Sequence, residues 1–171
     1  MGRYRVRMIE QVTAGWAEFS VATAGAGAAL AGLVMVVISV NVREILASAS
    51  LPARAGAAVG SLVLVVVTAL LLLLPGQSAG VLGAEILLAA LAAIVLHARS
   101  LWQSLQQRAR PLSARITAIP LAAVQLLPIA IGAVLMMLGN PVALYWVAIG
   151  LVLTIIGSML DSWVLMVEIL R

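Results

Sequence analysis

Long stretches without a charged side chain recur along this chain, and they constrain its fold more than any other feature. Only 9% of the 171 residues are charged, whereas 64% are hydrophobic. A soluble domain carries about a quarter charged residues and fewer than half apolar ones. Apolar runs of about 20 residues are typical of membrane-spanning helices, and transmembrane β-strands instead alternate over about ten residues. The sequence therefore predicts an all-α fold, a polytopic transmembrane helix bundle.

Charges and turn residues divide the chain into five predicted spans. The spans are expected at about residues 19–42, 55–74, 80–98, 116–138 and 142–167. Pro75-Gly76 and Gly139-Asn140-Pro141 are turn signals between spans. Residues 1–18 form a polar arm, residues 19–171 form one transmembrane domain, and the polar loop 99–115 can begin as an interfacial helix. A re-entrant hairpin over 19–42 is the alternative to a first span, because Ala24-Gly25-Ala26-Gly27 can break a helix.

The arginines predict how the chain sits in the membrane. With five spans, Arg3, Arg5 and Arg7 fall on the N-terminal side. Seven arginines fall on the other side: Arg43, Arg54, Arg99, Arg108, Arg110, Arg115 and Arg171. Arginine-rich loops stay in the cytoplasm, so we expect the N-terminus outside and the C-terminus inside. The sequence pI of about 11.1 then indicates contact with anionic lipid and not with nucleic acid.

Polar residues inside the predicted spans are the first candidates for function, because an intramembrane charge is costly unless it faces protein or water. The candidate pore or ion-pair residues are Arg43, Glu85, His97, Arg99, Gln125, Asp161 and Glu168. A structural interpretation pairs Asp161 and Glu168 with the basic residues at the same membrane face. The alternative is an ion or proton path past Glu85, Gln125 and Asp161.

Small residues at helical spacing predict close contacts between helices. The candidate packing residues are Gly25, Gly32, Gly56, Gly60, Gly150 and Gly157. In the fifth span, Gly150, Thr154, Gly157, Asp161 and Glu168 follow one helical stripe, which suits a packing or pore face. Such patterns leave open whether the contacts lie within one chain or between copies.

The residue inventory predicts no enzyme and no cofactor. The chain has no cysteine and a single histidine, which excludes the usual zinc sites and a bis-histidine haem within one chain. Gly76-Gln77-Ser78-Ala79-Gly80 matches the serine-hydrolase elbow in letters, but that elbow requires a strand before it. His97 also lies at the far end of the following helix, roughly 25–30 Å away.

The segments Glu18–Gly25, Val40–Leu46 and Asp161–Arg171 resemble small polytopic membrane proteins of actinobacteria and other bacteria, a family of unknown function. The resemblance implies a multi-pass protein of the bacterial cytoplasmic (inner) membrane. All ten basic residues are arginine, which is typical of a GC-rich bacterial genome. Together these features favour a structural or accessory component that binds membrane lipid and assembles as a homo-oligomer or with a membrane protein partner. A small ion channel or transporter that uses the intramembrane acids is the alternative.

Overall fold

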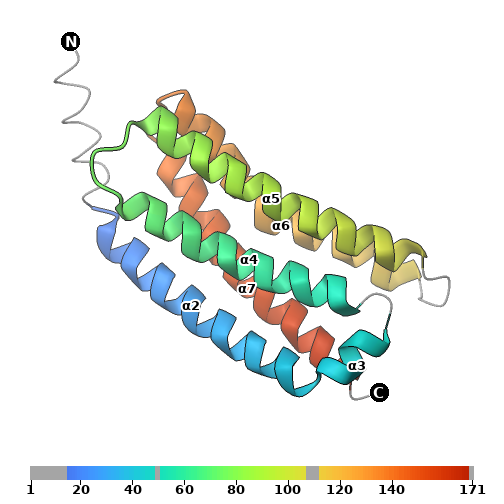
Figure 1. Cartoon of the computed structure of the whole chain (residues 1–171). Helices are drawn as coiled ribbons and strands as arrows, with labels where there is room; N and C mark the ends of the chain where they lie inside the picture. Colours follow the sequence, from blue (N-terminus) through green and yellow to red (C-terminus); the bar gives the residue numbers. More distant parts are fainter. Residues whose placement is uncertain (1–14, 49–50, 107–111, 170–171) are drawn as a thin grey trace, which may run out of the picture.

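The computed structural model describes residues 15–48, 51–106 and 112–169, which form six helices and no strand (Figure 1). The helices are α2 (Ala17–Val40), α3 (Val42–Ala47), α4 (Leu51–Leu73), α5 (Ala79–Gln106), α6 (Leu112–Met137) and α7 (Ala143–Ile169). Five of them are long and apolar enough to cross a membrane: Ala17–Val40, Leu51–Leu73, Ala79–Gln103, Pro120–Met137 and Ala143–Val164. The predicted all-α, five-span transmembrane bundle is thus confirmed, and the chain is a multi-pass membrane protein.

Helices α4, α5, α6 and α7 form a closed four-helix body. Each packs against the next along the chain, and α7 returns to pack on α4. Every member of the main hydrophobic core comes from these four helices, with Val65, Ile86, Ile129 and Val147 fully buried at its centre. The four-helix body therefore holds its own core.

Helix α2 lies outside this body. It packs along α4 and has only sparse contact with α7 (Figure 1). Ser20, Thr23 and Gly27 are its only buried residues, and five of its ten large apolar side chains are exposed. Its first turn is held by Trp16, whose ring makes edge-to-face contacts with Phe19 and, at 5.0 Å between centroids, with Tyr145 at the start of α7.

The bundle has two unlike ends, which we call the turn end and the arginine end. The turn end carries the α4–α5 and α6–α7 connections, and the arginine end carries α3 together with Arg43, Arg54 and Arg99. At the turn end α6 stops in a Schellman motif, because the amides of Gly139 and Asn140 donate to the carbonyls of Met136 and Leu135. Gly139 takes φ +72°, a conformation that glycine adopts without strain.

Several boundaries differ from those that the sequence predicts. Helix α2 is continuous through Ala24-Gly25-Ala26-Gly27, so the structure has a single spanning helix where a re-entrant hairpin was the alternative. Helix α4 begins at Leu51, four residues early, since Pro52 is tolerated in a first helical turn. Helix α5 continues to Gln106 where a separate interfacial helix was expected. The polar arm as far as residue 14 and the loop residues 107–111 lie outside the described residues.

Candidate functional site

Polar side chains from all four helices of the body meet toward its arginine end. We call them the Asp161 cluster, which consists of Arg54 and Ser61 from α4, His97 from α5, Gln125 from α6 and Asp161 from α7. Ser61 and Gln125 are buried, and the other three are half-buried. Each helix of the body thus contributes at least one polar group to a single region.

Asp161 is the only carboxylate of this cluster. It is attracted by the charges of Arg54 and His97, and its carboxylate lies within reach of the Gln125 amide. Neither Nε2 nor Oε1 of Gln125 has a hydrogen bond of ordinary geometry to any described residue. The two basic side chains offset part of the cost of placing this acid in a membrane helix, and their attraction ties α7 to α4 and α5.

The hydrogen bonds of His97 are compatible with two protonation states. Its Nδ1 lies 3.0 Å from the Ala93 carbonyl, which can only accept, so Nδ1 carries a proton. Its Nε2 lies 3.3 Å from the Ser61 hydroxyl, which also lies 3.1 Å from the Ala57 carbonyl. When His97 is neutral, the Ser61 hydroxyl can donate to Nε2. When His97 is charged, Nε2 can donate to the Ser61 oxygen, and the Ser61 hydroxyl then donates to the Ala57 carbonyl. The contacts therefore remain usable when His97 gains or loses a proton.

Gln125 is held by the small-residue face of α7. The Thr154 hydroxyl lies 2.9 Å from the Gln125 carbonyl and 2.7 Å from the Gly150 carbonyl, so one proton is shared between two helices. The Gln125 side chain packs directly on Gly157, where an added Cβ would overlap it. A glycine at position 157 is thus what makes room for a buried amide.

Arg54 and Ser61 were missed by the sequence reasoning. With α4 starting at Leu51, Arg54, Ser61 and Thr68 are seven residues apart and share one helical face. The Thr154–Asp161 stripe of α7 has the same seven-residue spacing. The proline in the first turn of α4 was the sequence signal that this helix begins before Arg54. Placing the start of this span at residue 55 had left Arg54 in a loop.

The other candidate residues lie elsewhere. Arg43 and Arg99 are exposed at the arginine end, and the Glu168 side chain lies outside the described ones. Glu85 is at the turn end, where its Oε2 accepts a 2.8 Å hydrogen bond from Gln77. Glu85 and His97 are twelve residues apart on α5, which is roughly 18 Å. The interior between them is filled by apolar side chains such as Ile86 and Ala90, so Glu85 does not share a site with Asp161.

The predicted packing glycines divide into two groups. A Cβ on Gly150 would lie 2.7 Å from the backbone nitrogen of Ile129, and one on Gly60 would lie 2.6 Å from Leu96. These two glycines and Gly157 are pressed against neighbouring helices. Nothing lies within 4 Å of such a Cβ at three positions, Gly25, Gly32 and Gly56.

Two further close contacts escaped the sequence reasoning. Gly83 approaches the backbone of α6 at Ala133, and Gly132 approaches the backbone of α7 at Val147. Gly132 has no small residue three or four positions away that would have singled it out, whereas Gly83 follows Ala79 and Gly80 at that spacing and was passed over. Close packing within the four-helix body is therefore more extensive than the motifs indicate.

The chemistry available to the Asp161 cluster is that of charge and proton exchange. Across the part of the chain that the structure describes, no three His, Cys, Asp or Glu side chains come together as a metal site would require.

Comparisons with protein-family models, with curated proteins and with solved structures find no significant match.

Proposed function

We propose that the protein is a structural or accessory component of the bacterial inner membrane that associates, through α2, with another copy of itself or with a membrane protein partner. The observation that supports this proposal is the contrast between a four-helix body with its own core and the first span, α2, which packs mainly on α4 and leaves its outer face exposed. In a bilayer, association of helices depends on packing and on hydrogen bonds between them, because lipid tails are as apolar as leucine.

The outer face of α2 has the features of a helix-packing surface. Gly25, Ala29 and Gly32 are exposed and follow one another at four- and three-residue spacing. Both glycines have open space above them, so a second helix can approach the backbone closely. Ala28 lies beside them and is also exposed. Within the body, Gly150 and Gly157 make contacts of just this kind with α6.

Cysteine cross-linking tests the association, since the natural chain contains no cysteine. Ala29→Cys places one thiol on the exposed face of α2, and Leu91→Cys places one on an exposed position of α5 as the matched control. Mild oxidation of membranes is expected to give a disulfide-linked species of at least twice the monomer mass for Ala29→Cys only. Equal cross-linking of both variants, or none of Ala29→Cys, would contradict the proposal.

The distribution of arginines supports one orientation in the membrane. We expect the turn end outside the cell and the arginine end in the cytoplasm, because arginine-rich segments resist translocation. In intact cells, a membrane-impermeant maleimide should label Leu74→Cys at the turn end and leave Glu44→Cys on α3 unlabelled until the cells are opened. The reverse labelling pattern would invert the orientation.

A second function, proton or cation transport, is favoured by one specific observation. The Asp161 cluster holds a carboxylate, a histidine whose contacts suit two protonation states, and a buried amide within reach of that carboxylate. Intramembrane acids and histidines of this kind form proton relays in pumps and transporters. Association of α2 helices and transport through the body are compatible, so each needs its own test.

Flux measurements separate the two functions. In proteoliposomes that contain a pH-sensitive dye, transport through the cluster predicts that Asp161→Asn abolishes the protein-dependent proton flux. Glu85→Gln, at the other end of the bundle, is the matched control and should leave most of the flux. Flux that is absent from the natural protein, or unchanged in Asp161→Asn, would eliminate the transport function and leave the cluster as an interhelical tie.

A further inference from the structure

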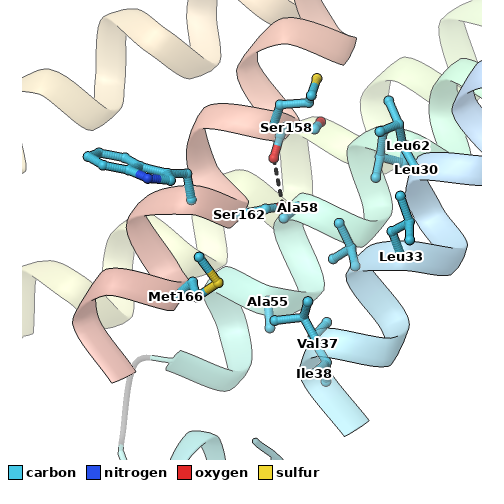
Figure 2. A pocket seen from close by; sticks show the side chains of 13 residues that line it. Leu30, Leu33, Val37, Ile38, Ala55, Ala58, Leu62, Ser158, Ser162 and Met166 are labelled. Carbon is cyan, nitrogen blue, oxygen red and sulfur yellow. Dashed lines mark hydrogen bonds between the residues drawn. The ribbon is translucent and has the colours of Figure 1, made fainter. Parts of the chain in front are cut away.

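An apolar groove runs between α2 and α7 at the arginine half of the bundle, with α4 as its floor (Figure 2). Its walls include Leu33 and Val37 from α2 and Met166 from α7, and Ala55 and Ala58 form the floor. Ser162, whose hydroxyl donates to the Ser158 carbonyl at 2.7 Å, lies on the α7 wall. The groove exists because α2 and α7 both pack on α4 but only sparsely on each other.

The groove requires an apolar occupant. Its volume is about 250 Å³, whereas an apolar cavity of about 150 Å³ already stays dry and takes up a small hydrocarbon. The small side chains of the floor, Ala55 and Ala58, keep it deep. Because α2, α4 and α7 are membrane spans, the groove lies in the hydrocarbon region, where acyl chains surround the protein.

Positive charge lies at the same end of the bundle as the groove. Arg43 is exposed on α3, which directly follows the α2 wall, and Arg54 immediately precedes the floor residue Ala55. Among the residues of this end whose side chains the structure describes, arginines outnumber acids three to two: Arg43, Arg54 and Arg99 against Glu44 and Asp161. The described charges of the turn end are both acidic, Glu18 and Glu85. A headgroup above the groove therefore meets a field that favours negative charge.

From this juxtaposition we infer that the groove is a binding site for an anionic phospholipid of the arginine-side leaflet. One acyl chain fills the space between α2 and α7, and the phosphate lies near Arg43. The bound lipid covers the apolar surface that the splayed helices leave open, and it joins α2 to the four-helix body. This site is independent of the association through α2, which uses the opposite, glycine-bearing face.

Fluorescence quenching by brominated lipid tests the site, because Trp163 lines the groove and is 61% exposed. The probe protein retains Trp163 alone, through Trp16→Phe, Trp102→Phe and Trp146→Phe. It is placed in phosphatidylcholine nanodiscs that contain a fixed fraction of acyl-brominated phosphatidylglycerol or of acyl-brominated phosphatidylcholine. We expect the anionic lipid to be enriched roughly fivefold over phosphatidylcholine at Trp163. This is the ratio that an attraction of about 1 kcal/mol from one arginine near the headgroup produces. Arg43→Gln should bring this ratio close to one.

Two substitutions fill the groove from different sides. Ala58→Leu fills it from the floor, and Leu33→Phe fills it from the 64%-exposed α2 wall, where the larger ring is easily accommodated. Each should abolish the enrichment, whereas Leu88→Phe on the lipid-facing side of α5 should preserve it. Equal quenching by both lipids would overturn the proposal, as would enrichment that survives both groove-filling variants. Complete protection of Trp163 from either lipid would show that a second protein chain, and not lipid, occupies the groove.

Discussion

Helices α2 and α7 carry the same pair of glycines in opposite surroundings. Gly25 and Gly32 on α2 are seven residues apart, as are Gly150 and Gly157 on α7. The α7 pair is pressed against Ile129 and Gln125 of α6, while nothing lies within 4 Å of a Cβ on the α2 pair. Small-residue spacing therefore marks a surface capable of close approach, whereas residues elsewhere in the chain decide which partner covers that surface.

The largest expected difference between the two helices is in their tolerance of a larger side chain. Gly150→Val should lower the free energy of unfolding by about 3 kcal/mol, because the added atoms overlap the α6 backbone at Ile129. Gly25→Val should change the free energy of unfolding of the monomer by less than about 0.5 kcal/mol, as surface substitutions usually do. Steric trapping in bicelles measures both values, and equal losses would remove the basis of the comparison.

The next expected effect concerns charge at the arginine end. Asp161→Ala leaves Arg54 and His97 without the nearby carboxylate and should cost about 2 kcal/mol, less than for a fully buried pair because these groups are half-buried. Glu85→Ala removes an acid bound to Gln77 and should cost about 1 kcal/mol.

A double-mutant cycle measures the interaction between Asp161 and Arg54. If Asp161 and Arg54 act on each other, the loss in the double variant Asp161→Ala/Arg54→Ala should be smaller than the sum of the single losses. Additive losses would mean that the cluster does not couple α4 to α7.

A smaller effect separates two hydroxyl groups that make the same local hydrogen bond. Thr154 on α7 and Ser39 on α2 both donate to a carbonyl four residues earlier, but only Thr154 also reaches another helix, at the Gln125 carbonyl. Thr154→Val should therefore cost about 1 kcal/mol and Ser39→Ala close to nothing. A loss in Ser39→Ala as large as that in Thr154→Val would indicate that the interhelical contact contributes nothing.

Much of the fold was predictable because each span carries its own signal. A run of about 20 apolar residues specifies a membrane helix without reference to the rest of the chain. The Pro75-Gly76 and Gly139-Asn140 turns were likewise readable, since Gly76 and Gly139 supply the positive φ that these turns need. The helix boundaries were harder to predict from the sequence. Helix α5 continues to Gln106 because its polar end residues are good helix formers that do not stop a helix.

The candidate site was predictable only in part because it is assembled from separate helices. Asp161, Gln125 and His97 were singled out by their polarity, and the structure brings them together. Arg54 was missed through an error of four residues in the start of α4. Glu85 was grouped with Asp161 because both are intramembrane acids, although Glu85 lies at the turn end and Asp161 lies toward the arginine end. Nothing in the spacing of Gly25 and Gly150 distinguishes an exposed glycine from a packed one.

Association of the glycine-bearing face of α2 with another protein chain can be measured by native mass spectrometry of the protein in lipid nanodiscs. The natural chain should give a discrete assembly larger than one 17.7 kDa chain. Gly25→Leu/Gly32→Leu should give the monomer with the free energy of unfolding changed by less than about 0.5 kcal/mol, while Leu88→Phe on α5 keeps the assembly. A natural chain that is monomeric, or an assembly that survives the double substitution, would contradict the account.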